Sequence, residues 1–198
     1  MISPDDTERG RDFYFPPLSF FKNMKKFTHI AIFSYAGLGL FTPVLYSVLA
    51  KQGFSQLGYF LGLMTISSAI SALFVGKIGQ KYNLYTVFSV VTISCIPIFI
   101  LYTIPMPVYL VYLLQLVYGS VTVALYTVEQ TLVASLAKKD NLSADIGKYN
   151  TFIQLTIGVF MLIGGFLGQI TSYKTIVIIS VVALAISAIL ALNTKGSQ

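Results

Sequence analysis

The sequence predicts an all-α integral membrane protein, a bundle of six transmembrane helices. Three observations lead to this prediction. Of the 198 residues, 56% are hydrophobic and only 10% are charged, against roughly 25% charged residues in an ordinary soluble domain. Apolar runs of about 20 residues, the length that crosses the hydrocarbon core of a bilayer, recur along the chain. The basic residues gather in the segments between these runs, as the positive-inside rule describes.

The expected helices follow one another along the chain, and charged or turn-forming residues separate them. The first break contains Lys51 and Gly53, and the third contains Pro105 and Pro107, which are poorly tolerated inside a helix. Glycine and proline within the runs are compatible with membrane helices, in which both are more frequent than in soluble helices. The expected transmembrane runs are 28–50, 57–76, 84–104, 108–128, 150–171 and 175–193.

The segments between the runs predict how the chain crosses the membrane. With the N-terminus inside, only Lys51 and Lys174 of the 13 basic residues fall in outer segments. The positive-inside rule therefore predicts a multi-pass protein of the cell membrane with both termini cytoplasmic. Residues 1–26 are expected to form a cytosolic arm with an interfacial helix, or else a loose tail, while 27–193 form the transmembrane domain and 194–198 a cytosolic tail. Acidic residues precede the first run and no small-residue cleavage site follows it, so we expect no signal peptide.

The composition argues against several classes of function. The chain has one cysteine, Cys95, and one histidine, His29, which leaves no disulfide framework and no histidine-rich metal site. We therefore expect neither a metal nor a cofactor. The sequence contains no nucleophile–base pair, metalloprotease motif or carboxylate pair, so we do not expect an enzyme. It has no potassium-channel filter segment, and its basic residues are too dispersed for a nucleic-acid-binding face.

The end of the second run resembles a motif of the major facilitator superfamily. That motif reads Gly-x-x-x-Asp-Arg/Lys-x-Gly after the second helix of a half, and Gly76 and Lys81 match it in register. Gln80 stands where the family has aspartate and Asn83 where it has the last glycine, a weakened form that is common in the second half of these transporters. The missing aspartate puts the charge relay of the motif in doubt.

Other stretches are similar to the same family over about residues 27–193. Residues 37–43 look like the glycine-rich, proline-terminated first helix of a half, and residues 115–119 look like its fourth helix, with Gln115 where many members have arginine. Residues 146–150 and 164–168 look like the entry and the glycine-rich body of the fifth helix.

The resemblance implies a specific architecture and activity. Members of the family have twelve helices in two six-helix halves, with the transport pathway between them, and each half consists of two inverted three-helix repeats. The chain then corresponds to one half, similar to a C-terminal half, of a secondary transporter that moves a small solute by alternating access. It would need a second half, either a copy of itself or a separate chain. A natural half-length protein, a split-transporter subunit and a truncated product all stay open.

Polar stripes mark the candidate substrate pathway. In the fourth run, Gln115, Gly119, Thr122, Tyr126 and Glu129 recur at helical spacing, as do Tyr35, Gly39, Thr42 and Tyr46 in the first run. Polar groups avoid lipid, so each stripe faces either a wet cavity or another helix. The family implies that the first and fourth helices line the cavity. The candidate pathway residues are Tyr35, Thr42, Tyr46, Gln115, Thr122, Tyr126 and Gln154.

Three charged residues are coupling or gate candidates. Glu129 is an acidic residue at or near a span and marks an ion or proton pathway by default, although it could also snorkel to the inner surface or pair with Lys81 or Lys148. The resemblance places Lys77 and Lys81 in the loop that gates the cytosolic side. Buried cations are absent from the stripes, which favours neutral, amphipathic or aromatic solutes over anions. His29 is expected at the interface.

Two glycine pairs are expected to serve helix packing rather than ligand binding, because a Gly-x-x-x-Gly spacing lets two helix backbones approach closely. They are Gly58 with Gly62, and Gly164 with Gly168. The expected partners are the lipid bilayer, a small-molecule solute and a second six-helix half. The alternative function is a non-transporting membrane subunit, or an inactive remnant of a transporter.

Overall fold

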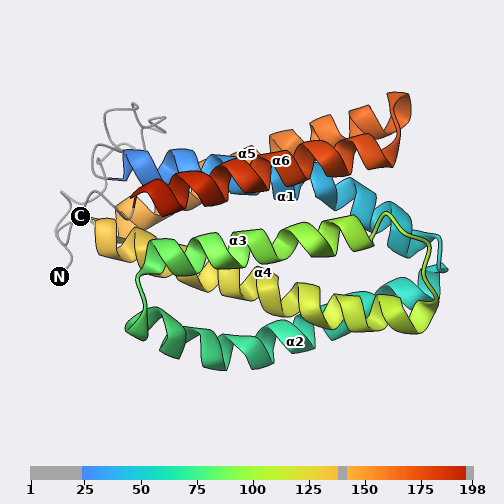
Figure 1. Cartoon of the computed structure of the whole chain (residues 1–198), viewed down its shortest axis with the longest axis horizontal. Helices are drawn as coiled ribbons and strands as arrows, with labels where there is room; N and C mark the ends of the chain where they lie inside the picture. The colour runs from blue at the N-terminus through green and yellow to red at the C-terminus, as the bar shows by residue number, and fades with distance from the viewer. Residues whose placement is uncertain (1–23, 138–141, 195–198) are drawn as a thin grey trace, which may run out of the picture.

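The computed structural model describes residues 24–137 and 142–194, and over these residues the protein is entirely helical. Six helices run back and forth along one long axis (Figure 1), and each is long and apolar enough to cross a membrane. Residues 1–23 of the predicted arm and 195–198 of the predicted tail lie outside the described residues. The helices are α1 (Lys25–Ala50), α2 (Phe54–Lys81), α3 (Leu84–Leu101), α4 (Val108–Leu136), α5 (Leu142–Ile170) and α6 (Tyr173–Thr194).

The helix ends differ from the predicted runs where the sequence turns polar. The fourth run was expected to stop at residue 128 and the fifth to start at 150, but α4 continues to Leu136 and α5 begins at Leu142. No proline or glycine interrupts residues 129–136, so the helix continues past the apolar stretch. Hydropathy marks the part of a helix that fits hydrocarbon, not the whole helix. The segment predicted as a loop after the second run is likewise helical as far as Lys81.

The packing of the helices has an internal symmetry. Helix α1 packs against α5 and α6, and α4 packs against α2 and α3. If α1, α2 and α3 are exchanged for α4, α5 and α6 in the same order, the pairs α1–α5 and α1–α6 become α4–α2 and α4–α3. The pair α3–α6 becomes itself. This exchange is the one that two three-helix repeats require. The helical bundle that the sequence predicts is therefore confirmed, and its pairings fit the repeats.

The six helices form two layers. Figure 1 shows α1, α5 and α6 on one side and α2, α3 and α4 on the other. The layers meet along α3 and α6, whereas the sequence neighbours α4 and α5 touch only sparsely. In Figure 1 these two helices diverge toward the end where α5 stops and α4 starts. They approach each other only near the connection that joins them.

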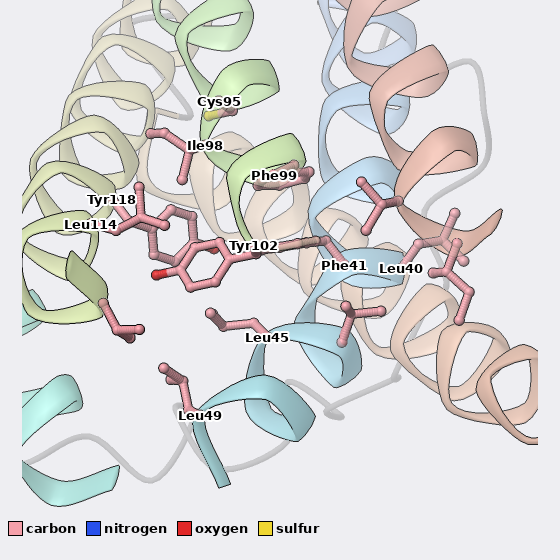
Figure 2. Packing of buried hydrophobic residues seen from close by; sticks show 14 of the residues in the cluster. Leu40, Phe41, Leu45, Leu49, Cys95, Ile98, Phe99, Tyr102, Leu114 and Tyr118 are labelled. Carbon is pink, nitrogen blue, oxygen red and sulfur yellow. The ribbon is translucent and has the colours of Figure 1, made fainter. Parts of the chain in front are cut away.

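Stacked aromatic rings join the layers at one end of the bundle. Phe41 of α1 lies face to face with Phe99 of α3, with ring centroids 3.7 Å apart and planes inclined by 11°. Tyr102 and Tyr118 pack around this pair (Figure 2). All four side chains are almost fully buried. The cluster fixes α1 against α3 and α4 and so holds the two layers together at this end.

A second apolar cluster lies toward the opposite end of the helices. Phe27 of α1 packs edge-on against Tyr85 and Phe88 of α3, and parallel to the ring of Tyr149 of α5, 6.2 Å away. Phe27, Phe88 and Tyr149 are completely buried. The apolar packing around these rings surrounds the polar group described next.

Candidate functional site

A buried carboxylate joins three helices near the connection between α4 and α5. Glu129 of α4 is 1% exposed. The hydroxyl of Tyr149 in α5 donates a 2.6 Å hydrogen bond to Oε1 of Glu129, and the hydroxyl of Tyr35 in α1 donates one to Oε2. Each carboxylate oxygen therefore accepts one phenol hydrogen, and the three buried side chains are hydrogen-bonded to one another.

The environment of Glu129 differs from two of the alternatives that the sequence left open. The side chain is buried, so it does not snorkel to the membrane surface. Its hydrogen bonds lead to two tyrosines rather than to Lys81 or Lys148. A carboxylate in a water-poor interior is costly unless it is hydrogen-bonded, and bonds that a charged group accepts are stronger than neutral ones. The two phenols therefore supply the stabilisation that an ion pair would otherwise give.

A second polar contact lies beside the carboxylate. The side-chain amide of Gln130 donates a 3.0 Å hydrogen bond to the Oδ1 atom of Asn150. Both residues are half-buried. Consecutive residues of α4, Glu129 and Gln130, thus bind consecutive residues of α5, Tyr149 and Asn150. We call Tyr35, Glu129, Gln130, Tyr149 and Asn150 the polar clamp.

The predicted stripe on α4 does not lie in one environment. Gln115 and Glu129 are buried, Thr122 is half-buried, and Tyr126 is 53% exposed. Helical spacing places these residues on one face of α4, but the neighbouring helices cover that face at Gln115 and Gly119 and again at Glu129. The middle of α4, around Thr122 and Tyr126, is the part of the stripe that stays open.

The stripe on α1 divides in the same way. Tyr35 is buried and bound to Glu129, Thr42 is half-buried, and Tyr46 is 45% exposed. The hydroxyl of Thr42 donates to the carbonyl of Leu38 at 2.8 Å. Thr122 on α4 likewise donates to carbonyls of its own helix, at 2.9 and 3.1 Å.

Gln154 is exposed on α5, and both candidate lysines are exposed on α2. Lys81 lies over the ring of Tyr82, with the ammonium nitrogen 5.7 Å from the ring centroid. Neither Lys77 nor Lys81 is near enough to be a hydrogen-bond partner of Glu129. The structure therefore brings together Tyr35 and Glu129 from the predicted set, and leaves Gln154 and the two lysines apart from them.

Gln115 lies in the interior at the other end of the stripe. It is completely buried, and neither its amide nitrogen nor its carbonyl oxygen has a hydrogen-bond partner. The hydroxyl of Tyr102, also buried, lacks one too. Unpartnered polar groups of this kind are costly inside a protein. Gln115 and Tyr102 lie beside each other, and with the buried hydroxyls of Ser34 and Thr86 they are the buried neutral polar groups of the described residues without a hydrogen bond of good geometry.

The four glycines predicted to serve helix packing differ in how closely neighbouring helices approach them. A β-carbon on Gly164 would come within 2.7 Å of the carbonyl oxygen of Leu40, so α5 and α1 touch there backbone to backbone. A β-carbon on Gly168 would meet only the side chain of Ile176, at 3.6 Å. At Gly58 and Gly62 it would meet nothing within 4 Å. Close packing at Gly58 and Gly62 is therefore not found within this chain, because the face of α2 that carries them is turned outward.

Two residues make contacts that the sequence did not predict: Gly119, which was expected only as a member of the stripe on α4, and Tyr149. Gly119 carries the tightest crossing, where α4 lies directly on the backbone of α2 at Met64. Tyr149 is the second partner of Glu129. A usable signal existed for Tyr149, since residues at equal distance from the connection of two antiparallel helices face each other. Tyr149 and Glu129 stand at equal distance from the ends of α5 and α4.

Two further observations bear on what the bundle does. Among the residues that the structure describes, no group of three histidine, cysteine or acidic side chains could hold a metal ion. A family model described as the Major Facilitator Superfamily matches residues 28–195, which covers nearly all of the described helices. No curated protein and no solved structure matches the chain.

Proposed function

The chain belongs to the major facilitator superfamily, and we propose that it forms one six-helix half of a secondary transporter that moves a small solute by alternating access. It is a multi-pass membrane protein of a family whose members are transporters rather than enzymes. The specific proposal is that α1 and α4 supply one wall of the solute pathway. Under the same proposal, both termini face the cytoplasm.

The observation that carries the proposal is the open middle of α4. Tyr126 lies about one turn from the centre of α4 and is 53% exposed. Exposed tyrosines of membrane proteins normally lie at the two interfaces, where the hydroxyl reaches water. Tyr126 itself lies two residues before the end of the apolar run 108–128, but the polar face of α4 continues inward from it to Thr122 and Gln115, and a polar face that runs through a span needs a wet cavity or a polar partner.

The proposed pathway residues are the polar side chains on the wall that α1 and α4 form, together with Gln154 of α5. Tyr126, Thr122, Thr42 and Tyr46 offer hydroxyl groups on the open parts of α4 and α1. Gln115 offers a buried amide beside the hydroxyl of Tyr102, and Gln154 a polar side chain on the exposed face of α5. These groups are uncharged, so we propose a neutral, amphipathic or aromatic solute rather than a phosphate or carboxylate.

A second half follows from the same geometry. One bundle gives a pathway a single wall, and the spans of α2 and α5 bury only 17% and 11% of their residues within the chain, the smallest shares among the described helices. We propose that a second six-helix unit faces this side, either another copy of the chain or a separate protein. Two parallel copies related by a two-fold axis along the membrane normal would satisfy the requirement.

Uptake into proteoliposomes tests the proposed function. Purified protein is reconstituted and offered a panel of uncharged aromatic and amphipathic solutes, with a pH or sodium gradient applied in separate experiments. We expect gradient-driven uptake of at least one neutral solute, and a Tyr126→Phe variant with weaker solute binding and a higher KM. If uptake responds to the pH gradient and a Glu129→Gln variant loses that response, Glu129 takes part in proton coupling.

The matched control is Tyr109→Phe, which removes a hydroxyl from an exposed tyrosine in the first turn of α4. This variant should behave as the wild type. Absence of uptake for every solute, by protein that is monomeric in detergent, would favour a non-transporting subunit or an inactive remnant instead.

A further inference from the structure

The first and fourth helices share a short sequence repeat. Residues 39–48 of α1 read GLFTPVLYSV, and residues 119–128 of α4 read GSVTVALYTV. Glycine, threonine, leucine, tyrosine and valine recur at the same places in both segments, and a serine of the first matches a threonine of the second. The two helices therefore correspond residue by residue, as two inverted three-helix repeats require.

The apolar residues of the repeat have matching environments. A β-carbon on Gly39 would collide with the backbone of α5, and one on Gly119 would collide with the backbone of α2. Leu45 and Leu125 are both buried. The symmetry of the helix pairings thus extends to single residues on α1 and α4.

The polar residues of the repeat match as well. Thr42 and Thr122 are both half-buried, and each hydroxyl donates to a carbonyl of its own helix. Each threonine oxygen therefore keeps its capacity to accept a hydrogen bond. Tyr46 and Tyr126 are 45% and 53% exposed, so each presents an aromatic ring and a hydroxyl outside the packed interior. The chain thus carries two equivalent threonine–tyrosine pairs.

The two helices run in opposite directions (Figure 1), which turns the pairs toward opposite ends of the bundle. The ring of Phe41 lies 6.3 Å from that of Tyr118, and Tyr35 binds Glu129 in the polar clamp. As the residue number falls along α1, the number of the opposite residue on α4 therefore rises. This register puts residues 42 and 122, the two threonines, at nearly the same height along the bundle.

Each tyrosine lies one helical turn beyond its threonine, so Tyr46 and Tyr126 stand on opposite sides of the threonine level. At 1.5 Å per residue, the two tyrosines are separated by about 12 Å along the bundle axis. Tyr46 of α1 lies near Tyr118 of α4, and Tyr126 of α4 lies near Tyr35 of α1. Both tyrosines therefore border the seam between α1 and α4, the wall that we propose for the pathway.

We propose that the two pairs are two equivalent solute stations, one formed by Thr42 and Tyr46 and the other by Thr122 and Tyr126, which hold the same solute in turn as it crosses. The inference rests on the proposed transport function and adds the number of binding positions and the chemistry of the solute. Because the threonine oxygens accept, the stations favour a neutral solute that carries an O–H or N–H donor. The tyrosine rings favour a solute whose donor stands beside an aromatic or apolar ring.

Cysteine labelling reports on each station separately. Ser47 and Thr127 are matched residues of the repeat, and each directly follows a station tyrosine, so Ser47→Cys and Thr127→Cys leave both stations intact. The thiols are reacted with a membrane-impermeant maleimide in permeabilised membranes. Val182→Cys is the control for a thiol in lipid, since Val182 is 51% exposed in the middle of α6. Cys95 of α3 is buried and free and serves as the internal reference for general loosening.

Phenol and anisole are the probe solutes. Phenol is a neutral ring with one O–H donor, and anisole is the same ring with that donor methylated. Phenol should slow labelling at both reporters, and it should do so at about fivefold lower concentration than anisole, because one neutral hydrogen bond separates the two solutes. Labelling of Cys95 should stay unchanged, and Val182→Cys should react far more slowly than either reporter.

A second substitution separates the two stations. Tyr46→Phe should raise the phenol concentration that protects Ser47→Cys by about threefold, since one hydroxyl is lost from that station, and should leave protection of Thr127→Cys unchanged. Tyr126→Phe should have the reverse effect. Both changes keep the aromatic ring, so the packing of α1 and α4 is preserved.

Three results would overturn the stations. Weaker protection at both reporters in each tyrosine variant would show a single shared site. Equal protection by phenol and anisole, or no protection by phenol, would contradict the donor chemistry. Reporters that react no faster than Val182→Cys would show that the pairs face lipid.

These outcomes are independent of transport, because labelling needs no gradient and no uptake. A protein with separately protected stations but no uptake of any solute keeps the stations and loses the proposed transport function. A protein that takes up a solute while both tyrosine variants affect both reporters keeps the transport function and loses the two stations.

Discussion

The effect of replacing a glycine in this bundle depends on what lies next to its α-carbon. A β-carbon on Gly119 would collide with the backbone of α2 at Met64, whereas one on Gly58 would meet nothing within 4 Å. Both residues lie inside long apolar helices. The same added methyl group therefore has opposite consequences at the two positions, since it forces α4 and α2 apart in one case and only removes glycine's backbone freedom in the other.

Alanine substitution tests this contrast directly. Gly119→Ala should lower the free energy of unfolding by about 1–3 kcal/mol, the usual effect of overpacking, and should lower the unfolding temperature in detergent. Gly58→Ala should leave that temperature unchanged or raise it slightly. Equal losses at both positions would show that α2 and α4 do not cross as described.

Spacing in the sequence predicts part of the candidate site but not its contacts. The helical repeat of Gln115, Thr122, Tyr126 and Glu129 correctly puts these residues on one face of α4. It does not say which helix covers which part of the face, because that depends on partners far away in the chain. Tyr35 was predicted as a pathway residue from its own stripe, and only the three-dimensional structure reveals that its hydroxyl binds Glu129 of α4.

At the scale of the helices, the contact between α4 and α5 is sparse and carries two side-chain hydrogen bonds, from Tyr149 to Glu129 and from Gln130 to Asn150. The amide–amide bond from Gln130 to Asn150 is half-buried and joins these two helices where few apolar groups do so. Hydrogen bonds between membrane helices contribute modestly, about 0.6 kcal/mol on average. The pair should therefore couple weakly but measurably.

A double-mutant cycle measures that coupling. Gln130→Ala and Asn150→Ala should each reduce stability, and the double variant should lose less than the sum of the two by about 0.5–1 kcal/mol. Unfolding in detergent with increasing denaturant gives the free energies. Strict additivity would mean that the two amides do not interact in the folded protein.

Hydropathy predicts the number and order of the helices because each run of apolar residues must satisfy its own backbone in lipid. It does not predict that α4 reaches Leu136 or that α5 begins at Leu142, because these ends leave the hydrocarbon. It also gives no information on pairing. Every helix has an apolar surface, and the choice of α5 and α6 as partners of α1 depends on small residues such as Gly164, which meets Leu40.

For the whole molecule, the outward faces of α2 and α5 are the surfaces on which we place the contact with a second copy. Gly62 is exposed on α2, and the groove beside it, about 410 Å³ in volume, is lined by Gly58, Tyr59 and Tyr112 among others. Ile178 is exposed on α6, a helix that packs on α1 and α3 and is buried within the chain more than α2 or α5. If a second copy supplies the other wall of the pathway, α2 is buried in the pair and α6 stays in lipid.

Crosslinking between copies distinguishes these faces. A bifunctional maleimide should link Gly62→Cys protein into a dimer in membranes and should leave Ile178→Cys protein monomeric. Buried Cys95 remains unreactive in both and needs no replacement. Equal crosslinking at both positions would indicate random collision, and none at either would exclude a second copy as the partner on this face.

The pairing of α1 with α5 and α6 also determines the order in which the protein can assemble. Of the six described helices, α1 leaves the ribosome before the others, and its main neighbours α5 and α6 are the last two of the six to follow. Until α4 emerges, the hydroxyl of Tyr35 has no carboxylate to bind, and until α5 emerges, the backbone at Leu40 has no glycine beside it. The nascent chain must therefore hold its first helix unpaired through most of translation, and the native bundle can close only after α5 and α6 have been inserted.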